Sequence, residues 1–263
     1  MVGTRASELN VDERLRDIAS RYDRLARVSR HAALAPGDRG GYKSRYVSAV
    51  FNAALMNALQ AIAPIPRLLD FGCGTGVFAR EAAAHCGEMV GIDVSAAALG
   101  LARSDDLLGS RFHPVLADGR RLPFADASFD VCVARESLCY IDEQSLPAAL
   151  REIRRVLKLG ASFLLLDQVS EHEQWQHHPA APNVIKRSPS ELRGALADAG
   201  LACSGATVVR HPRFPWIYPV ALGLVPERWL PSLARREVNW HRNRPPRPRW
   251  RWYNMLFVAR AVN

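Results

Sequence analysis

The sequence predicts an α/β fold in which helices cover both faces of a mainly parallel, seven-stranded sheet. Three observations support this prediction. Short apolar runs alternate with segments of helical period from residue 64 onward, the first run leads into a glycine-rich turn, and 263 residues that are 48% hydrophobic and 23% charged suit one elaborated domain. A helix between two strands returns the chain to the same end of the sheet, so this alternation favours parallel pairing.

The expected elements follow one another in a regular order. Residues 11 to 63 keep a helical period, with a Pro/Gly break at 36 to 41. Beyond them we expect strands at 67–71, 88–94, 112–116, 129–134, 162–167, 202–209 and 253–262. We expect intervening helices at 78–85, 96–104, 146–158 and 190–199. This order is typical of a Rossmann-like core that binds its ligand at the carboxyl ends of the strands.

The charge distribution separates the chain into parts. The formal net charge is +4 over residues 1–63, −4 over residues 64–208 and +9 over residues 209–263, where all 11 basic residues are arginines. The last segment also holds five of the six tryptophans. We therefore expect an N-terminal helical cap (1–63), a Rossmann-like core (64–208), a basic Arg/Trp-rich insertion that serves as a lid (209–254) and a final core strand (255–263).

Cysteine usage and hydropathy indicate a cytoplasmic protein. The five cysteines form no C-x-x-C pair, so we expect free thiols in a reducing compartment and no metal site. The first ten residues have no apolar stretch typical of a secretory signal. The longest apolar run, residues 214–225, contains two prolines and is well short of the roughly 20 residues that span a bilayer.

The most informative motif is the strand-to-helix turn at residues 68–76, Leu-Leu-Asp-Phe-Gly-Cys-Gly-Thr-Gly. Glycines there allow a tight turn and a close approach of a ligand to the backbone. The spacing differs from the G-x-G-x-x-G of dinucleotide folds, and Asp70 would repel a pyrophosphate. A ligand that carries a positive charge fits this loop better.

Two more acids end predicted strands. Asp93 follows Val90-Gly91-Ile92 and could accept hydrogen bonds from both hydroxyls of a ribose. Asp118 precedes Gly119 and could accept a hydrogen bond from an adenine amino group. Because the carboxyl ends of parallel strands meet at one edge, the three carboxylates are expected to form one rim.

With these motifs in this order, the chain resembles a class I S-adenosylmethionine-dependent methyltransferase. The resemblance covers residues 64–208 and the final strand. It implies a set of cofactor-binding residues: Asp70, Gly72, Cys73 and Gly74 at the methionine part, Asp93 and Val94 at the ribose, Asp118 and Gly119 at the adenine, and Ala134 and Arg135 at the amino acid end. Similar enzymes often place an arginine about where Arg45 stands, against the cofactor carboxylate, although a solvated helix face is the alternative for this residue.

Methyl transfer is an in-line displacement, so the site must chiefly align the reactants and exclude water. If the acceptor is a hydroxyl, a base assists the reaction. Many relatives carry histidines where Cys139 and Tyr140 stand, so the candidate bases here are Glu136, Tyr140 and His172. His177 and His178 lie further along the same loop.

For the acceptor we favour a small molecule, anionic or glycosylated, under the lid, because Arg binds phosphate or carboxylate and Trp stacks on rings. An RNA and an anionic membrane surface that carries a lipid-linked acceptor are the alternatives, and no recognisable RNA-binding module is present. A catalytically inactive relative would have lost the three acids, and all three remain. An NAD-dependent oxidoreductase is disfavoured by Asp70 and the glycine spacing.

Overall fold

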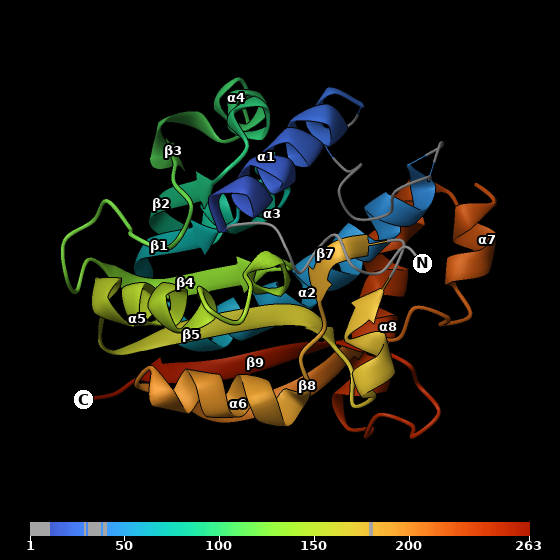
Figure 1. Ribbon diagram of the computed structural model, residues 1–263. Helices are drawn as coiled ribbons and strands as arrows, with labels where there is room; N and C mark the ends of the chain where they lie inside the picture. Colours follow the sequence, from blue (N-terminus) through green and yellow to red (C-terminus); the bar gives the residue numbers. More distant parts are fainter. Residues whose placement is uncertain (1–10, 29, 31–37, 39–40, 179–180) are drawn as a thin grey trace.

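The computed structural model describes residues 11–28, 30, 38, 41–178 and 181–263, and for residues 177, 178, 181 and 182 it describes the backbone alone. Two helices precede the sheet, and the element order then alternates (Figure 1). The helices are α1 (Val11–Val28), α2 (Tyr42–Ile62), α3 (Val77–Ala82), α4 (Ala96–Arg103), α5 (Leu146–Val156), α6 (Pro189–Asp198), α7 (Ile217–Ala221) and α8 (Leu230–Arg242). The main strands are β1 (Ile65–Phe71), β2 (Cys86–Asp93), β3 (Phe112–Leu116), β4 (Phe129–Arg135), β5 (Leu157–Val169), β8 (Leu201–Arg210) and β9 (Tyr253–Ala261).

These seven strands form one sheet in the order β3-β2-β1-β4-β5-β9-β8, and β9 runs antiparallel to both of its neighbours. The other pairs are parallel, so the predicted mainly parallel sheet is confirmed. A separate short hairpin joins β6 (His177–His178) to β7 (Ala181–Ile185). The strand order reverses between β1 and β4, and this reversal opens a crevice at the carboxyl end of the sheet.

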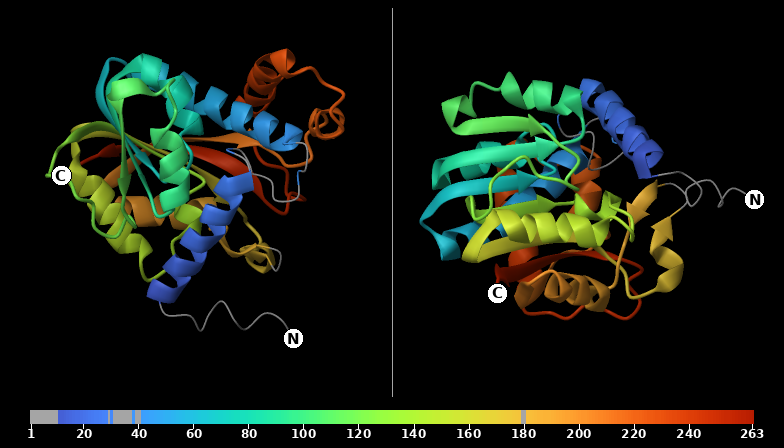
Figure 2. Two further views of the ribbon diagram at one scale, coloured as in Figure 1. Left: turned by 90° about the horizontal axis from the view of Figure 1, so that it is seen from above. Right: turned by 60° about the vertical axis from the view of Figure 1, so that its left-hand side comes forward.

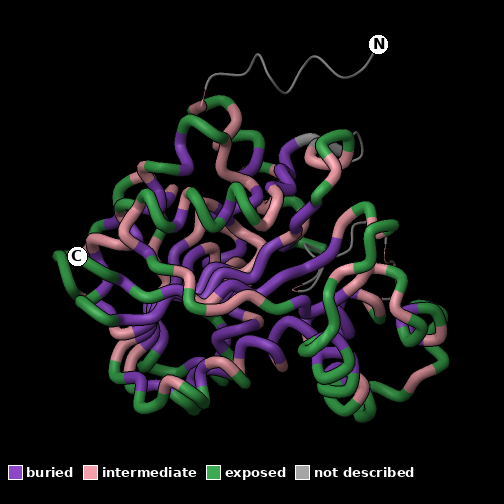
Figure 3. The backbone as a smooth tube through the Cα atoms, turned by 90° about the horizontal axis from the view of Figure 1, so that it is seen from below, coloured by how far each residue is buried: buried purple, intermediate pink, exposed green. Residues whose placement is uncertain are grey.

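Helices cover both faces of the sheet, and the strands through the middle of the molecule are buried (Figure 3). Residues of α2, α3, α4, α7 and α8 share one apolar cluster with one set of strand side chains. Residues of α5 and α6 share the other cluster with the alternate set. In α5 the apolar residues Leu146, Leu150 and Ile153 recur at helical spacing, so one face of the helix is buried.

The local sequence explains where several helices begin. The Ser95 hydroxyl accepts a hydrogen bond from the Ala98 backbone N–H at the start of α4. Ser188 and Glu191 form a reciprocal capping box at the start of α6. These polar residues satisfy backbone donors that the first turn of a helix leaves without partners.

The segment between β8 and β9 leaves and re-enters the sheet at the same edge as the crevice. It contains α7 and α8, and α8 packs on α2. Figure 2 shows α7 projecting from the rest of the molecule. β8 ends at Arg210 and β9 begins at Tyr253, so the insertion runs from residue 211 to residue 252, two residues shorter at each end than the expected 209–254. None of the described helices is long and apolar enough to cross a membrane.

Candidate active site

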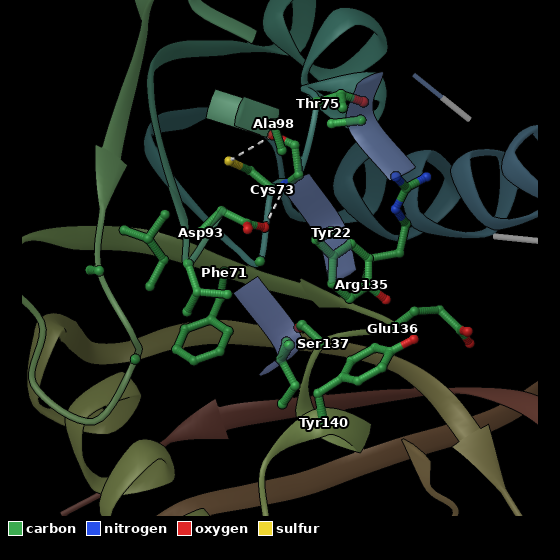
Figure 4. Close-up of a pocket in the computed structure, with 18 of the residues that line it drawn as sticks. Tyr22, Phe71, Cys73, Thr75, Asp93, Ala98, Arg135, Glu136, Ser137 and Tyr140 are labelled. Atoms are coloured by element: carbon green, nitrogen blue, oxygen red, sulfur yellow. Dashed lines mark hydrogen bonds between the residues drawn. The ribbon is translucent and has the colours of Figure 1, made fainter. Parts of the chain in front are cut away.

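A pocket of about 140 Å³ lies at the carboxyl ends of β1, β2 and β4, and α1 covers it. In Figure 4, Cys73 and Asp93 line one side, and Arg135, Glu136 and Tyr140 line the other. Eight of the predicted cofactor-binding residues are in its wall: Gly72, Cys73, Gly74, Asp93, Val94, Asp118, Gly119 and Arg135. The topology therefore brings together residues from four separate segments of the sequence.

The glycine loop requires glycine for two different reasons. Gly72 has φ of 77°, and a Cβ there would lie 2.5 Å from the Cβ of Ser137, so the loop after β4 leaves no room for a side chain. Gly74 has φ of 53°, and a Cβ there would meet nothing within 4 Å. The first glycine allows two protein segments to approach, whereas the second leaves open space beside the pocket.

Asp93 holds the loop in place. Its carboxylate accepts hydrogen bonds from the Gly74 N–H at 2.8 Å and from the Ser95 N–H at 2.8 Å. Burial raises the pKa of Asp93, although the backbone hydrogen bonds oppose this shift. Each carboxylate oxygen has further lone pairs, so Asp93 can also accept from a ligand hydroxyl.

Asp70 lies directly behind the pocket and is 1% exposed, and its Oδ2 has no hydrogen-bond partner. Burial raises its pKa to about 7, the nearby Arg135 opposes this shift, and Asp93 adds to it. The Arg135 guanidinium donates instead to Asn52 Oδ1 at 2.9 Å and to Ser48 Oγ at 3.3 Å in α2. A positive charge in the pocket would stabilise the ionised form of Asp70.

Asp118 lines the far end of the pocket and is bound by Arg120. The Arg120 Nε and Nη2 donate to it at 2.9 and 2.6 Å, and the Arg120 backbone N–H donates at 2.9 Å. Burial opposes ionisation of Asp118, but these hydrogen bonds hold its pKa below the usual range. Asp118 is therefore an ionised acceptor at neutral pH.

Glu136 is the carboxylate on the opposite wall. Its backbone has φ of 53°, unusual for a residue other than glycine, and its N–H donates to the Leu166 carbonyl at 2.8 Å. Its side chain accepts from Gln168 Nε2 at 2.7 Å and from Asn254 Nδ2 at 2.6 Å. Burial and then the neighbouring Asp167 raise the pKa of Glu136 well above its usual range.

Comparison with known proteins identifies the family. The profile of a family described as a methyltransferase domain matches residues 68–160, which run from β1 into β5. Residues 68–160 are therefore a methyltransferase domain of the class I S-adenosylmethionine-dependent type. The family's cofactor is S-adenosylmethionine.

Two curated relatives of the chain are methyltransferases of different reaction type. The O-methyltransferase cnsE of Penicillium expansum is 37% identical over 157 residues, which are 55% of this chain and 55% of that protein. The 24-methylenesterol C-methyltransferase 2 of Oryza sativa subsp. japonica is 34% identical over 221 residues, which are 78% of this chain and 60% of that protein. The chain thus spans less than two thirds of the length of either relative.

Among solved structures, the geranyl diphosphate C-methyltransferase of Streptomyces coelicolor A3(2) has a TM-score of 0.67 to this chain. The two chains are 20% identical over 95% of this chain and 98% of that one, and that structure contains S-adenosyl-L-homocysteine. The likeness shows a common fold over almost the whole chain.

The described residues of the pocket fit S-adenosylmethionine. The unpartnered Oδ2 of Asp70 and the pocket's carboxylates suit a ligand with positive charges, and the open space at Gly74 admits a ligand next to the backbone. A Cβ on Gly119 would lie 2.3 Å from the Phe71 ring, so the turn that follows Asp118 packs directly on β1.

Besides Asp70, which lies behind the pocket, three predicted residues lie outside the pocket wall. Ala134 is buried in β4, next to Arg135. Arg45 is on α2, where its guanidinium pairs with Glu227 of the insertion at 2.9 Å and lies over the Tyr42 ring. His172 donates from its Nε2–H to the Pro248 carbonyl at 3.1 Å, so it contacts the insertion.

Tyr140 is in the pocket wall, but its environment disfavours the role of a base. Its ring packs edge-on against Tyr22 of α1 at 5.4 Å. Burial raises the pKa of the Tyr140 phenol well above its usual range, so it stays protonated. Tyr140 is therefore a neutral hydrogen-bonding group, which leaves Glu136 as the better placed of the predicted bases.

The expected N-terminal helical cap supplies one wall of the pocket through α1, although no individual residue of α1 was predicted to line it. Asp23 accepts from the Ser95 hydroxyl at 2.5 Å and from the Ala97 N–H at 3.1 Å, which holds α1 against the start of α4. Arg30 donates to the Thr75 carbonyl at 3.2 Å, and the Thr75 hydroxyl donates to the Arg30 carbonyl at 2.9 Å. These contacts join residues that are 45 or more positions apart in the sequence, and no local motif predicts them.

Proposed function

We propose that this protein transfers a methyl group from S-adenosylmethionine to a hydroxyl of a small-molecule acceptor, with Glu136 as the base. The observation that supports this most is the half-buried Glu136 carboxylate in the wall opposite Asp93. O-methyltransferases among the relatives agree with transfer to oxygen.

The cofactor supplies a methyl group on a positively charged sulfur. The residues of the chain bind and orient it: Asp93 accepts from the ribose hydroxyls, Asp118 accepts from the adenine amino group, and Asp70 compensates positive charge. The helix α1 closes the site with Tyr22 and other side chains, which excludes water from the reacting atoms.

Glu136 then accepts the proton of the acceptor hydroxyl as the new bond forms. Two features suit it to this role. The amides of Gln168 and Asn254 fix the position of the carboxylate, and its raised pKa makes it a stronger proton acceptor once it is ionised. Gln168 and Asn254 are positioning residues, since they act through Glu136.

Transfer to carbon is the second candidate. The relative that matches the largest part of this chain among those described above is a sterol C-methyltransferase. Addition of a methyl group to a double bond creates a carbocation, which then loses a proton. The Glu136 carboxylate could stabilise the positive charge and accept that proton. Identification of the methylated atom in the product distinguishes the two reactions.

The test is calorimetric titration with S-adenosylmethionine and its demethylated product, followed by a labelled-methyl screen over small hydroxylated and phosphorylated metabolites. We expect micromolar cofactor binding and transfer to a small molecule. Asp93→Ala should abolish cofactor binding, and Arg260→Gln on the far end of β9 should leave it unchanged. Absence of cofactor binding to the wild type would refute the proposal.

A further inference from the structure

A second cavity, of about 790 Å³, lies within the insertion and shares no lining residue with the first pocket. It is formed by the segment that follows β8, one side of α8 and the segment that leads into β9. Five arginines line it: Arg213, Arg236, Arg247, Arg249 and Arg251.

The positive charge of this cavity is not compensated within the described part of the insertion. Its only two acids, Glu227 and Glu237, face other cations: Glu227 pairs with Arg45 at 2.9 Å, and Glu237 lies 3.9 Å from Arg210. No described acidic residue lines the cavity. Five guanidinium groups around one hollow repel one another, and an anion between them would relieve this repulsion.

A buried imidazole nitrogen without a hydrogen-bond partner belongs to a residue that lines the cavity. His241 of α8 is 2% exposed, and its Nε2 has no hydrogen-bond partner among the described residues. Next to it, His211 stacks on Trp250 with ring centroids 4.3 Å apart. Burial, followed by charged neighbours that include Arg210, lowers the pKa of each histidine to about 4. Both imidazoles are neutral at pH 7, and each then offers one N–H to a ligand.

The walls of the cavity are aromatic. Trp216, Trp240, Trp250 and Trp252 line it together with Phe214, whose ring lies 5.3 Å from that of His241. Indole faces bind apolar or ring-shaped bodies, and guanidinium forks bind the oxygens of phosphate bidentately. A single carboxylate would neutralise one of five charges, whereas a phosphate ester or diphosphate brings two or more negative charges.

We propose that this cavity is a binding site for a phosphorylated small molecule, with the phosphate or diphosphate group on the arginines and the organic part against the tryptophans. The site does not depend on the reaction proposed for the first pocket. The two sites are linked by side chains: Arg210, which precedes His211, donates to Asn254 at 3.4 Å, and Asn254 donates to Glu136.

The probes are pyrophosphate, 1-naphthyl phosphate and, as the uncharged control, 1-naphthol. Binding is measured by calorimetry and by tryptophan fluorescence, which reports mainly on this region because five of the six tryptophans belong to the insertion. We expect saturable binding of both phosphates at physiological salt, tighter for 1-naphthyl phosphate, and weak binding of 1-naphthol. Saturation of the first pocket with S-adenosylhomocysteine should not displace the probes.

The variant Arg247→Gln/Arg249→Gln removes two exposed cavity arginines. The matched control is Arg228→Gln/Arg235→Gln, which removes the same charge from exposed arginines of the insertion outside the cavity. Loss of charge-assisted hydrogen bonds should weaken 1-naphthyl phosphate about tenfold or more in the first variant, with little change in the control. Equal weakening in both variants, or no saturable binding to the wild type, would overturn the proposal.

The result is separable from the test of the first pocket. If the phosphate probes bind but no methyl transfer is found, only the proposed reaction is refuted. If methyl transfer is found but the phosphate probes do not bind, only the phosphate-binding site is refuted. Once a phosphorylated acceptor is identified, turnover is measured with added pyrophosphate. An increase in the KM for the acceptor would assign the site to the acceptor. Unchanged turnover would assign it to a separate phosphorylated ligand.

Discussion

Asn254 Nδ2 donates a hydrogen bond to Glu136 Oε1 at 2.6 Å, although 118 residues separate the two in the sequence. The contact exists because the antiparallel strand β9 lies beside β5, where Asn254 is in register with Gln168. Gln168 donates to the other oxygen of Glu136. Two neighbouring strands thus orient the carboxylate that follows a third, β4.

Replacement of Glu136 by Gln should lower kcat by about 10²–10⁴-fold, the usual contribution of a general base. Cofactor affinity should stay within about twofold, since the amide keeps the shape of the carboxylate. The measurement is steady-state turnover with the identified acceptor across pH. In the wild type the rate should rise with pH as Glu136 ionises. A rise of the same size in Glu136→Gln would assign that ionisation to another group.

Affinity for S-adenosylmethionine should increase with pH up to about pH 7 and then level off. Burial raises the pKa of Asp70 to about 7 in the free protein, and a cationic ligand favours the ionised carboxylate, so binding releases a proton below that pH. The slope should approach about tenfold per pH unit. It should be smaller for S-adenosylhomocysteine, which has one positive charge fewer. Calorimetry from pH 5.5 to 8.5 tests this, and a wild-type slope retained in Asp70→Asn would exclude Asp70 as its source.

The contribution of Asp70 to the stability of the free protein should fall as pH rises from about 4 to 7. The folded pKa of Asp70 lies above the unfolded value, so its contribution to stability is fully present below the unfolded pKa and is lost as pH rises through the folded pKa. Asp70→Asn removes this titration and should be more stable than the wild type at pH 8 by roughly 1–3 kcal/mol, with a smaller gain at pH 5. Urea unfolding at both pH values gives the comparison, and a gain that is equal at the two would contradict the assignment.

Gly74→Ala should weaken cofactor binding far more than it weakens the fold. The new Cβ enters open space beside the pocket, so the cost of folding is the positive φ alone, about 1–2 kcal/mol. Gly72→Ala is the matched control, because its Cβ would collide with Ser137 and should cost more stability. Thermal unfolding and calorimetry of both variants test the difference. Normal cofactor affinity in Gly74→Ala would show that the space beside Gly74 is not used.

Much of the fold could be predicted from local sequence, because the strands and helices show the spacing of apolar residues typical of each and are separated by glycine-containing turns. All seven predicted strands appear within a few residues of their expected limits. The same reasoning placed Asp93, Asp118 and Glu136 at strand ends, and topology then brings strand ends to one edge. It failed for Arg45, because the helical period of α2 does not reveal that Glu227, in a distant insertion, pairs with that face.

The sequence by itself determined the succession of strands and helices along the chain, the glycine loop and the acids at the strand ends, since these depend on residues close together in the chain. Only the tertiary structure decided that α1 closes the pocket, that Asn254 and Gln168 hold Glu136, and that five arginines of the insertion surround one cavity. Those arrangements join segments tens of residues or more apart. They are fixed by packing and long-range hydrogen bonds, for which no local pattern of residues is required.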